Sequence, residues 1–140
     1  MLLFRLDRHA KRLSESAKFL GYAIAPEKIY DTIVEFVRRN KPKNPIYIRP
    51  LVYTSDLDIS PRLNDIEKNL LVYGLELGDY LPASGVKVTI SSWTRQSDAS
   101  FPLRGKISGA YITSALAKNE AVNRGFDDAI LMNRDGKVCE

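Results

Sequence analysis

The spacing of apolar residues changes along the chain, and this change constrains the fold more than any other feature of the sequence. Apolar residues recur every three or four positions over 6–20 and 26–40, which predicts two amphipathic helices. Strand-like segments follow at 46–53, 69–77 and 85–93. A further helix is expected from about 112 to 124, ending at Gly125, and "DAILM" and "KVC" then flank a tight turn at Asp135 and Gly136. This succession predicts an α+β fold.

A short stretch rich in small residues, "LPASG" at 81–85, interrupts the strand-like segments and marks the expected domain boundary. We expect a small N-terminal domain of helices and strands over 1–81, a linker at 82–85, and the first part of a larger domain over 86–140. The first helix begins almost at once, and the chain stops just after "KVC" starts the second arm of a hairpin. We therefore expect the chain to be a fragment of a longer protein.

Composition argues against several classes of protein. No apolar run approaches the roughly 20 residues of a membrane-spanning helix, and the apolar start is too short for a secretory signal. The single cysteine excludes an internal disulfide and favours a reducing compartment, here taken as the cytoplasm. One cysteine and one histidine argue against a zinc site, so no metal is expected. The net charge of +4 is spread over helix faces without interleaved aromatic residues, so no nucleic-acid partner is expected.

Three places carry residues that could do chemistry. In "YIRP", Tyr47 and Arg49 alternate along a strand and so share a face, where a hydroxyl beside a guanidinium could bind a carboxylate. On spacing alone, an exposed polar pair explains them as well. Arg12 lies near the apolar stripe of the first helix, where it could bind phosphate, braced by His9, or extend its head to solvent. Glu140 in isolation indicates nothing.

The third place is "RGKISGAY" at 104–111, in which a lysine is surrounded by small residues. A partly deprotonated Lys106 could attack an aldehyde, and Gly105 and Gly109 would allow a flat ligand close to the backbone. Tyr111 could donate a hydrogen bond to a phenolate-type oxygen. The alternative is a loop lysine that precedes a helix capped by Ser108.

Taken together and in this order, the motifs resemble those of the branched-chain amino acid aminotransferases, which are fold-type IV (class IV) pyridoxal-phosphate enzymes. The resemblance covers nearly the whole chain. It favours this group over the D-amino acid transaminases and aminodeoxychorismate lyases that share the fold, which remain the alternatives. The motifs are "RLDRHAKRL", "YIRPLVY", "SSWTR", "RGKISGAYITSALAKNEA" and "GFDDAILMNRDGKVCE".

The resemblance also implies roles for single residues. Lys106 is similar to the catalytic lysine that binds the aldehyde of pyridoxal 5′-phosphate and moves the substrate proton. Arg12 resembles the arginine that binds the cofactor phosphate, and Tyr111 the tyrosine beside the phenolate oxygen. Glu140 resembles the carboxylate that pairs with the ring nitrogen. Tyr47 and Arg49 resemble the substrate-binding pair, in which the arginine meets the distal carboxylate of glutamate.

The implied activity is a ping-pong transfer of the amino group between branched-chain amino acids and 2-oxoglutarate. The implied partners are these amino acids, their 2-oxo acids and the glutamate/2-oxoglutarate pair, with a homodimer or larger homo-oligomer as the assembly. The chain departs from the family at Leu77 and in the loop 55–65, both near the expected substrate pocket. As a fragment, the 140-residue chain is expected to be inactive by itself, acting only as a folded domain.

Overall fold

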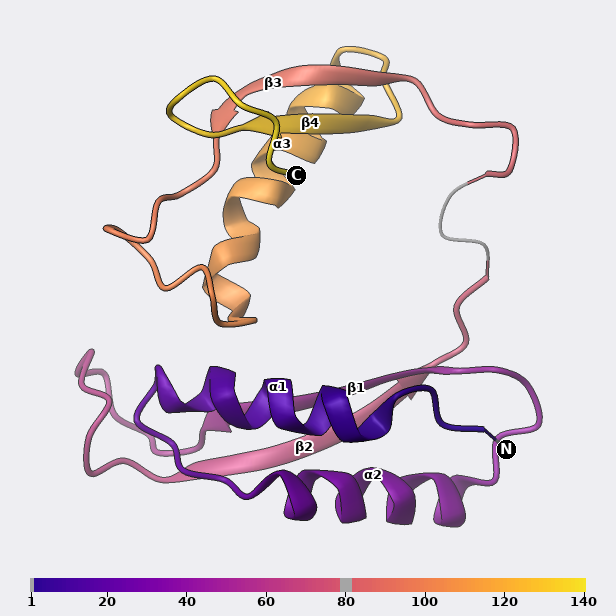
Figure 1. Ribbon diagram of the computed structural model, residues 1–140, viewed down its shortest axis with the longest axis vertical. Coiled ribbons are helices and arrows are strands. Elements are labelled where there is room, and N and C mark those ends of the chain that lie inside the picture. Colours follow the sequence, from indigo (N-terminus) through magenta and orange to yellow (C-terminus); the bar gives the residue numbers. More distant parts are fainter. Residues whose placement is uncertain (1, 79–81) are drawn as a thin grey trace. The chain divides into compact units, whose positions relative to one another are not determined.

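The computed structural model describes residues 2–78 and 82–140, which separate into two compact units, Met1–Gly78 and Asp79–Glu140 (Figure 1). Each unit has its own helices and its own pair of strands. The expected division into 1–81, 82–85 and 86–140 stays a prediction. Its residues 79–81 lie outside the described part of the chain.

Two amphipathic helices begin the first unit, α1 (Leu6–Lys18) and α2 (Pro26–Asn40). Both confirm the helical spacing of the sequence. Helix α1 ends two residues before its expected end, and the chain then turns at Gly21, whose φ of +67° suits glycine. Helix α2 starts with Pro26 in its first turn, where a missing amide hydrogen costs nothing, and ends at Asn40, after which Lys41 lies in the left-handed region.

The first unit continues with an antiparallel hairpin of β1 (Tyr47–Thr54) and β2 (Lys68–Leu75). Pro50 lies opposite Val72, and a proline is tolerated there because both strands of a two-stranded sheet are edge strands. One face of the hairpin packs against the helices, through Ile48, Val52, Leu70 and Val72.

The core of the first unit lies between the two helices and this sheet face. Ile29 is fully buried, with Ala10 and Ile33 beside it at 1% and 2% exposure. Ser14 is buried as well, and its hydroxyl donates to the Ile24 carbonyl at 2.6 Å, so burial leaves that group satisfied. Gly74 lets α2 approach the sheet, because a Cβ there would lie 3.1 Å from the Phe36 ring.

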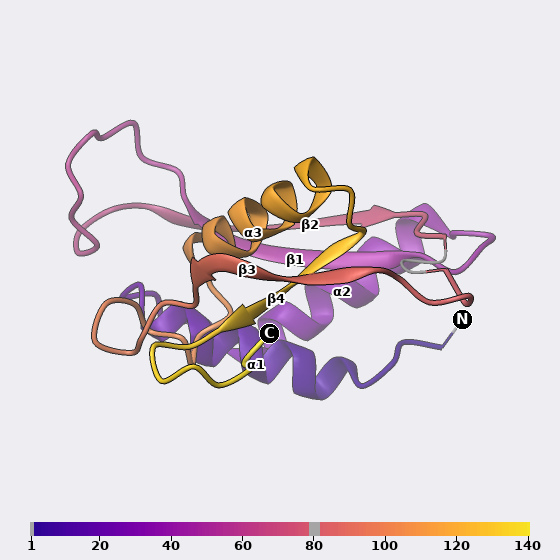
Figure 2. The same cartoon turned by 90° about the horizontal axis from the view of Figure 1, so that it is seen from above.

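The second unit is a β–α–β crossover, formed by β3 (Val88–Thr94), α3 (Tyr111–Asn123) and β4 (Asp128–Met132). Strands β3 and β4 run parallel and lie side by side (Figure 2). Helix α3 packs on both of them, as the return path between parallel strands requires. Gly125, with a φ of +80°, ends α3 as expected, and the amide of Phe126 donates to the Ala121 carbonyl at 3.0 Å.

The turn after β4 returns the chain antiparallel to that strand. Met132 and Val138 form a β-bridge, and Gly136 takes a φ of +73° in the turn, as its sequence position predicts. The amide of Leu131 donates to the Glu140 carbonyl at 2.7 Å. Glu140 is thereby tied through its main chain to Leu131, the buried residue of β4.

A single carboxylate joins α3 to β3. Glu120 accepts hydrogen bonds from the Ser91 hydroxyl at 2.7 Å, and from the amide and hydroxyl of Ser92, both at 3.0 Å. Arg124 adds an ion pair at 3.2 Å, and the Glu120 side chain is only 20% exposed. The Ser91 hydroxyl, followed by the Ser92 amide, holds the pKa of Glu120 below its ordinary value, against the opposing effect of burial.

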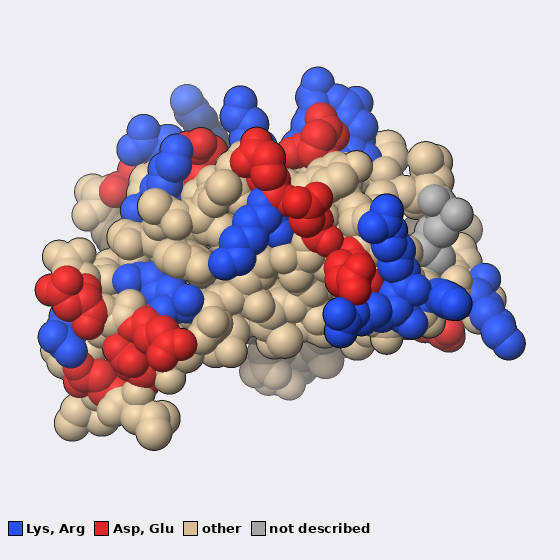
Figure 3. Space-filling view, turned by 90° about the horizontal axis from the view of Figure 1, so that it is seen from below, with Lys and Arg blue, Asp and Glu red and all other residues tan. Residues whose placement is uncertain are grey.

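Charges of both signs adjoin one another on the face shown in Figure 3. On the two helices of the first unit, Lys18 pairs with Glu15 at 2.9 Å and Arg39 with Glu35 at 2.6 Å. These pairs place basic side chains on solvated helix faces. None of the helices in residues 2–78 and 82–140 is long and apolar enough to cross a membrane.

We expect Ile29→Ala to lower the free energy of unfolding of the first unit by about 2–5 kcal/mol, because Ile29 is fully buried and its truncation leaves a cavity. Urea denaturation measures this loss. Ile59→Ala is the matched control: its side chain is fully exposed in the loop between β1 and β2, so its change should stay within about 0.5 kcal/mol. Similar losses for the two variants would contradict the assigned core.

We expect Glu120→Gln to destabilise the second unit at neutral pH and to have a smaller effect in acid. Because the folded pKa of Glu120 is lowered, its stabilisation is fully present above the unfolded pKa of about 4.3 and is lost as the pH falls through the folded pKa. The urea midpoints of the wild type and of Glu120→Gln, at pH 7 and at about pH 3, measure this loss of stability.

Glu15→Gln serves as the control, because Glu15 lies in an exposed ion pair whose removal changes stability little. A difference between wild type and Glu120→Gln that stays constant from pH 7 to about pH 3 would show that the charge of Glu120 does not stabilise the fold.

Candidate functional site

Lys106 lies in a loop that leads directly into α3. The amide of Gly105 donates to the Pro102 carbonyl at 3.0 Å, which turns the chain just before the lysine. A short 3₁₀ helix, η1 (Ser108–Ala110), then precedes Tyr111, the first residue of α3. The suggestion that Ser108 caps a helix was wrong, because Ser108 lies inside η1 and neither helical segment has a side-chain cap.

The lysine and the tyrosine that follows five residues later are in direct contact. The Lys106 Nζ donates a hydrogen bond to the Tyr111 hydroxyl at 2.5 Å and lies 5.0 Å from the centre of its ring. Both side chains are exposed at the surface of the second unit. An amine and a phenol are therefore presented together, as a cofactor with an aldehyde beside a phenolate oxygen would require.

Gly109, one of the small residues near Lys106, makes room for a neighbouring side chain. A Cβ at Gly109 would lie 3.0 Å from the Phe101 ring, so the glycine makes room for this aromatic side chain. The expectation that Gly109 gives a ligand access to the backbone stays a prediction, because the Phe101 ring occupies only the Cβ direction and Gly109 is itself exposed.

A carboxylate is held beside the start of α3. Arg95 Nη1 lies 2.8 Å from Glu140 Oε2, and the Ser114 hydroxyl donates to Glu140 Oε1 at 3.2 Å. The same Nη1 also donates to the Ala110 carbonyl at 3.1 Å and to the Ser114 hydroxyl at 3.2 Å. Both oxygens of Glu140 thus have a partner.

Helix α3 joins these two groups into one site. Tyr111 and Ser114 are three residues apart, so they lie on the same face of the helix within its first turn. Tyr111 contacts Lys106, and Ser114 contacts Glu140. Three expected site residues, Lys106, Tyr111 and Glu140, are therefore connected through the first turn of one helix.

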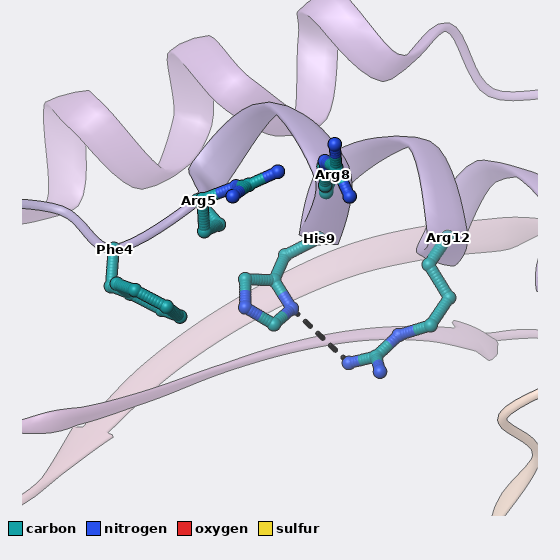
Figure 4. A pocket seen from close by; sticks show the side chains of 5 residues that line it. All are labelled: Phe4, Arg5, Arg8, His9 and Arg12. Atoms are coloured by element: carbon teal, nitrogen blue, oxygen red, sulfur yellow. Dashed lines mark hydrogen bonds between the residues drawn. The ribbon is translucent and has the colours of Figure 1, made fainter.

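Arg12, the expected phosphate ligand, lies in the first unit on α1. Its Nη2 lies 3.2 Å from His9 Nδ1, which confirms the expected contact between these two residues (Figure 4). Both side chains line a shallow, basic pocket of ≈ 290 Å³, together with Phe4, Arg5 and Arg8. The concentration of positive charge fits an anion such as a phosphate group.

Tyr47 and Arg49 lie on the sheet face of the first unit that the helices leave open. Both are exposed and share one face of β1, as the alternation along the strand predicts. The register places Leu75 opposite Tyr47 and Tyr73 opposite Arg49. The exposed Arg49 guanidinium is therefore bordered on this face by apolar and aromatic side chains of β2.

Sequence reasoning missed Arg95, Ser114 and Tyr73. Arg95 ends the motif "SSWTR", which contributed to the family resemblance but was given no role. Ser114 lies one turn after Tyr111, and this helical spacing could have placed it in the site. Tyr73 could have been found only from the strand register.

The chemistry of these residues fits pyridoxal 5′-phosphate. In the second unit, an amine, a phenol and an anchored carboxylate are groups of the kinds that an aldehyde, a phenolate oxygen and a ring nitrogen would need. In the first unit, considered by itself, a basic pocket is of the kind that binds phosphate. Each group is defined within its own unit. The roles assigned to the individual residues remain proposals.

Comparison with known proteins gives the family directly. The model of the family "Amino-transferase class IV" matches residues 2–140. A protein of Synechocystis sp. named "Probable branched-chain-amino-acid aminotransferase" is 69% identical over 140 residues, which are 100% of this chain and 46% of that protein. One of the same name from Aquifex aeolicus is 38% identical over 135 residues, covering 94% of this chain and 43% of its own.

Solved structures give the same result. The branched-chain aminotransferase of Thermoproteus uzoniensis, solved with norvaline, matches 98% of this chain and 47% of its own, with a TM-score of 0.90 and 37% identity. The branched-chain amino acid aminotransferase of Thermobaculum terrenum, solved in its PLP-form, matches 98% of this chain and 46% of its own, with a TM-score of 0.88 and 30% identity.

The chain thus spans just under half the length of these relatives. The helices and strands of both units confirm the α+β fold class, and the matches confirm the family resemblance seen in the motifs. Since the family model covers nearly every residue, the chain belongs to the class IV aminotransferases.

Proposed function

We propose that this chain is part of a branched-chain amino acid aminotransferase, which moves the amino group between leucine, isoleucine or valine and 2-oxoglutarate in two half-reactions. The observation that carries the proposal is the Lys106 amine 2.5 Å from the Tyr111 hydroxyl, on the same helix turn that anchors Glu140. The names of the relatives support the branched-chain substrates over those of the other class IV enzymes.

The proposed cofactor is pyridoxal 5′-phosphate. When bound, it supplies an aldehyde that carries the amino group and a ring that takes up electrons from the substrate α-carbon. Lys106 Nζ would hold the cofactor by condensing with its aldehyde and releasing water, and, once the amino group of the substrate displaces it, would take up and return the proton at the substrate α-carbon. The Tyr111 hydroxyl would orient the Lys106 amine, with which it shares a hydrogen bond, and the Glu140 carboxylate would keep the ring nitrogen protonated.

The first unit supplies the proposed phosphate and substrate contacts. Arg12 binds the phosphate by charge-assisted hydrogen bonds, and its contact with His9 supports it in this position. Tyr47 and Arg49 line the side-chain pocket, where Arg49 pairs with the distal carboxylate of glutamate. The apolar residues opposite them on β2 suit the side chains of leucine, isoleucine and valine.

Assembly and location complete the proposal. We infer a homodimer or larger homo-oligomer, supported by exposed apolar side chains such as Leu71, which is 46% exposed. A cytoplasmic location is supported by Cys139, which is a free, exposed thiol.

We expect Lys106→Ala to abolish covalent binding of the cofactor, because the lysine amine is the group that attacks the aldehyde. In a full-length protein that carries this chain, borohydride reduction of the wild type should fix one cofactor, and peptide mass spectrometry should locate it on Lys106. The Lys106→Ala variant should carry none.

Lys87→Ala is the control, because Lys87 is an exposed lysine just before β3 and has no place in the site. It should be labelled like the wild type. Labelling of Lys106→Ala at another lysine would remove Lys106 from the proposed role.

We expect Arg49→Ala to slow the half-reaction with glutamate more than the half-reaction with leucine, because only glutamate has a distal carboxylate. The lost charge-assisted contact is worth about 2 kcal/mol, or about 30-fold in kcat/KM. Single-turnover kinetics with each amino acid measure the two half-reactions separately.

The control for this variant is Arg38→Ala, which removes an exposed arginine from the last turn of α2. It should leave both half-reactions within about twofold, since surface substitutions have small effects. Equal losses with glutamate and leucine in Arg49→Ala would exclude Arg49 as the distal-carboxylate ligand.

A further inference from the structure

Arg95 occupies an unusual place for a long basic side chain. It directly follows β3, and its amide donates to the Met132 carbonyl at 2.9 Å, which fixes its main chain to the end of β4. Its side chain is only 19% exposed, although arginines are seldom enclosed without a partner. The partners of this guanidinium therefore explain why it lies there.

One nitrogen of Arg95 has three partners, which lie on two other segments of the chain. Nη1 lies 2.8 Å from Glu140 Oε2, 3.1 Å from the Ala110 carbonyl and 3.2 Å from the Ser114 hydroxyl. Ala110 immediately precedes Tyr111, and Glu140 follows the turn after β4. The guanidinium thus links the carboxylate to the start of the helix that carries Tyr111.

We infer that Arg95 is a positioning residue of the cofactor site, which acts by holding the Glu140 carboxylate in a fixed orientation beside α3. This inference rests on the proposed function, in which Glu140 pairs with the ring nitrogen. It assigns Arg95 no contact with cofactor or substrate.

The geometry at Glu140 supports this role. Its side chain is 42% exposed, so without partners the carboxylate would rotate freely in solvent. Arg95 holds Oε2, Ser114 holds Oε1, and Leu131 holds the main chain through its amide. Because both oxygens of the Glu140 carboxylate are held, its exposed edge always faces the same direction. A ring nitrogen that binds this edge therefore does not have to order the Glu140 side chain first, and binding avoids that entropic cost.

A purely structural role is the alternative, because Arg95 also satisfies the Ala110 carbonyl. The two roles differ in what they affect. Loss of a structural contact would weaken every ligand of the site, whereas loss of Glu140 positioning would weaken only ligands that have a ring nitrogen.

The test measures cofactor binding, by absorbance or fluorescence titration, in a full-length protein that carries this chain. The two ligands are pyridoxal 5′-phosphate and its carbocyclic analogue, in which a carbon replaces the ring nitrogen. We expect Arg95→Met to lower the affinity for pyridoxal 5′-phosphate by about tenfold to a hundredfold, the effect of losing a charged hydrogen-bond partner. The affinity for the analogue should fall by less than about threefold.

Two further variants make the test specific. Arg95→Lys keeps the charge and should retain part of the affinity, so it also serves if Arg95→Met does not fold. The double variant Arg95→Met/Glu140→Gln should bind pyridoxal 5′-phosphate no more weakly than Glu140→Gln alone, because Arg95 acts through Glu140. Arg134→Met, in the exposed turn after β4, is the matched control and should bind like the wild type.

The outcomes separate the inference from the proposed function. The positioning role would be overturned if Arg95→Met and Arg95→Lys lowered the affinity for both ligands equally. Additive losses of affinity in the double variant would overturn it as well, and either result would leave the proposed function intact. A wild-type protein that binds pyridoxal 5′-phosphate without a borohydride-reducible bond to Lys106 would overturn the proposed function itself.

Discussion

The parallel pairing of β3 with β4 is the constraint on which the second unit depends. Parallel strands cannot be joined by a tight turn, so the chain must cross back along a helix that covers the sheet. This return brings the first turn of α3 to the ends of both strands, where Arg95 and, after a turn, Glu140 are located. Side chains 45 residues apart thereby meet at one helix end, a common place for ligand sites in parallel sheets.

The first unit follows a different principle, since its sheet is covered on one face only. The helices bury Ile48 and Val52, while the alternate positions of the same strand stay in solvent. Because strand side chains alternate, the burial of one set fixes the exposure of the other, and Arg49 is placed within an apolar surface at no cost to the core. The fold of this unit thus presents the proposed substrate contacts as a consequence of packing its helices.

The sequence predicted the elements well and their connections poorly, for physical reasons. Helical spacing identified α1 and α2 because each buries one face, and Gly125 marked the end of α3 because few other residues adopt its φ. The expected strand from residue 85 begins only at Val88, because Gly85 closes a turn onto Pro82. The pairing of β3 with β4 could not be read from either strand, because alternation does not specify a partner.

The same limit applies to the candidate site. Local spacing could bring Lys106 and Tyr111 together, whereas the ion pair between Arg95 and Glu140 depends on the crossover, and no local pattern contains it.

The contact between Gly109 and Phe101 has a consequence for how this loop can vary. A larger residue at 109 would meet the aromatic ring at 3.0 Å, so it could be accommodated only with a smaller residue at 101. The two positions are therefore coupled and should change together among related proteins. Enlargement at 109 alone would shift the chain next to Lys106, so the size of the side chain at 101 limits which residues this segment can carry.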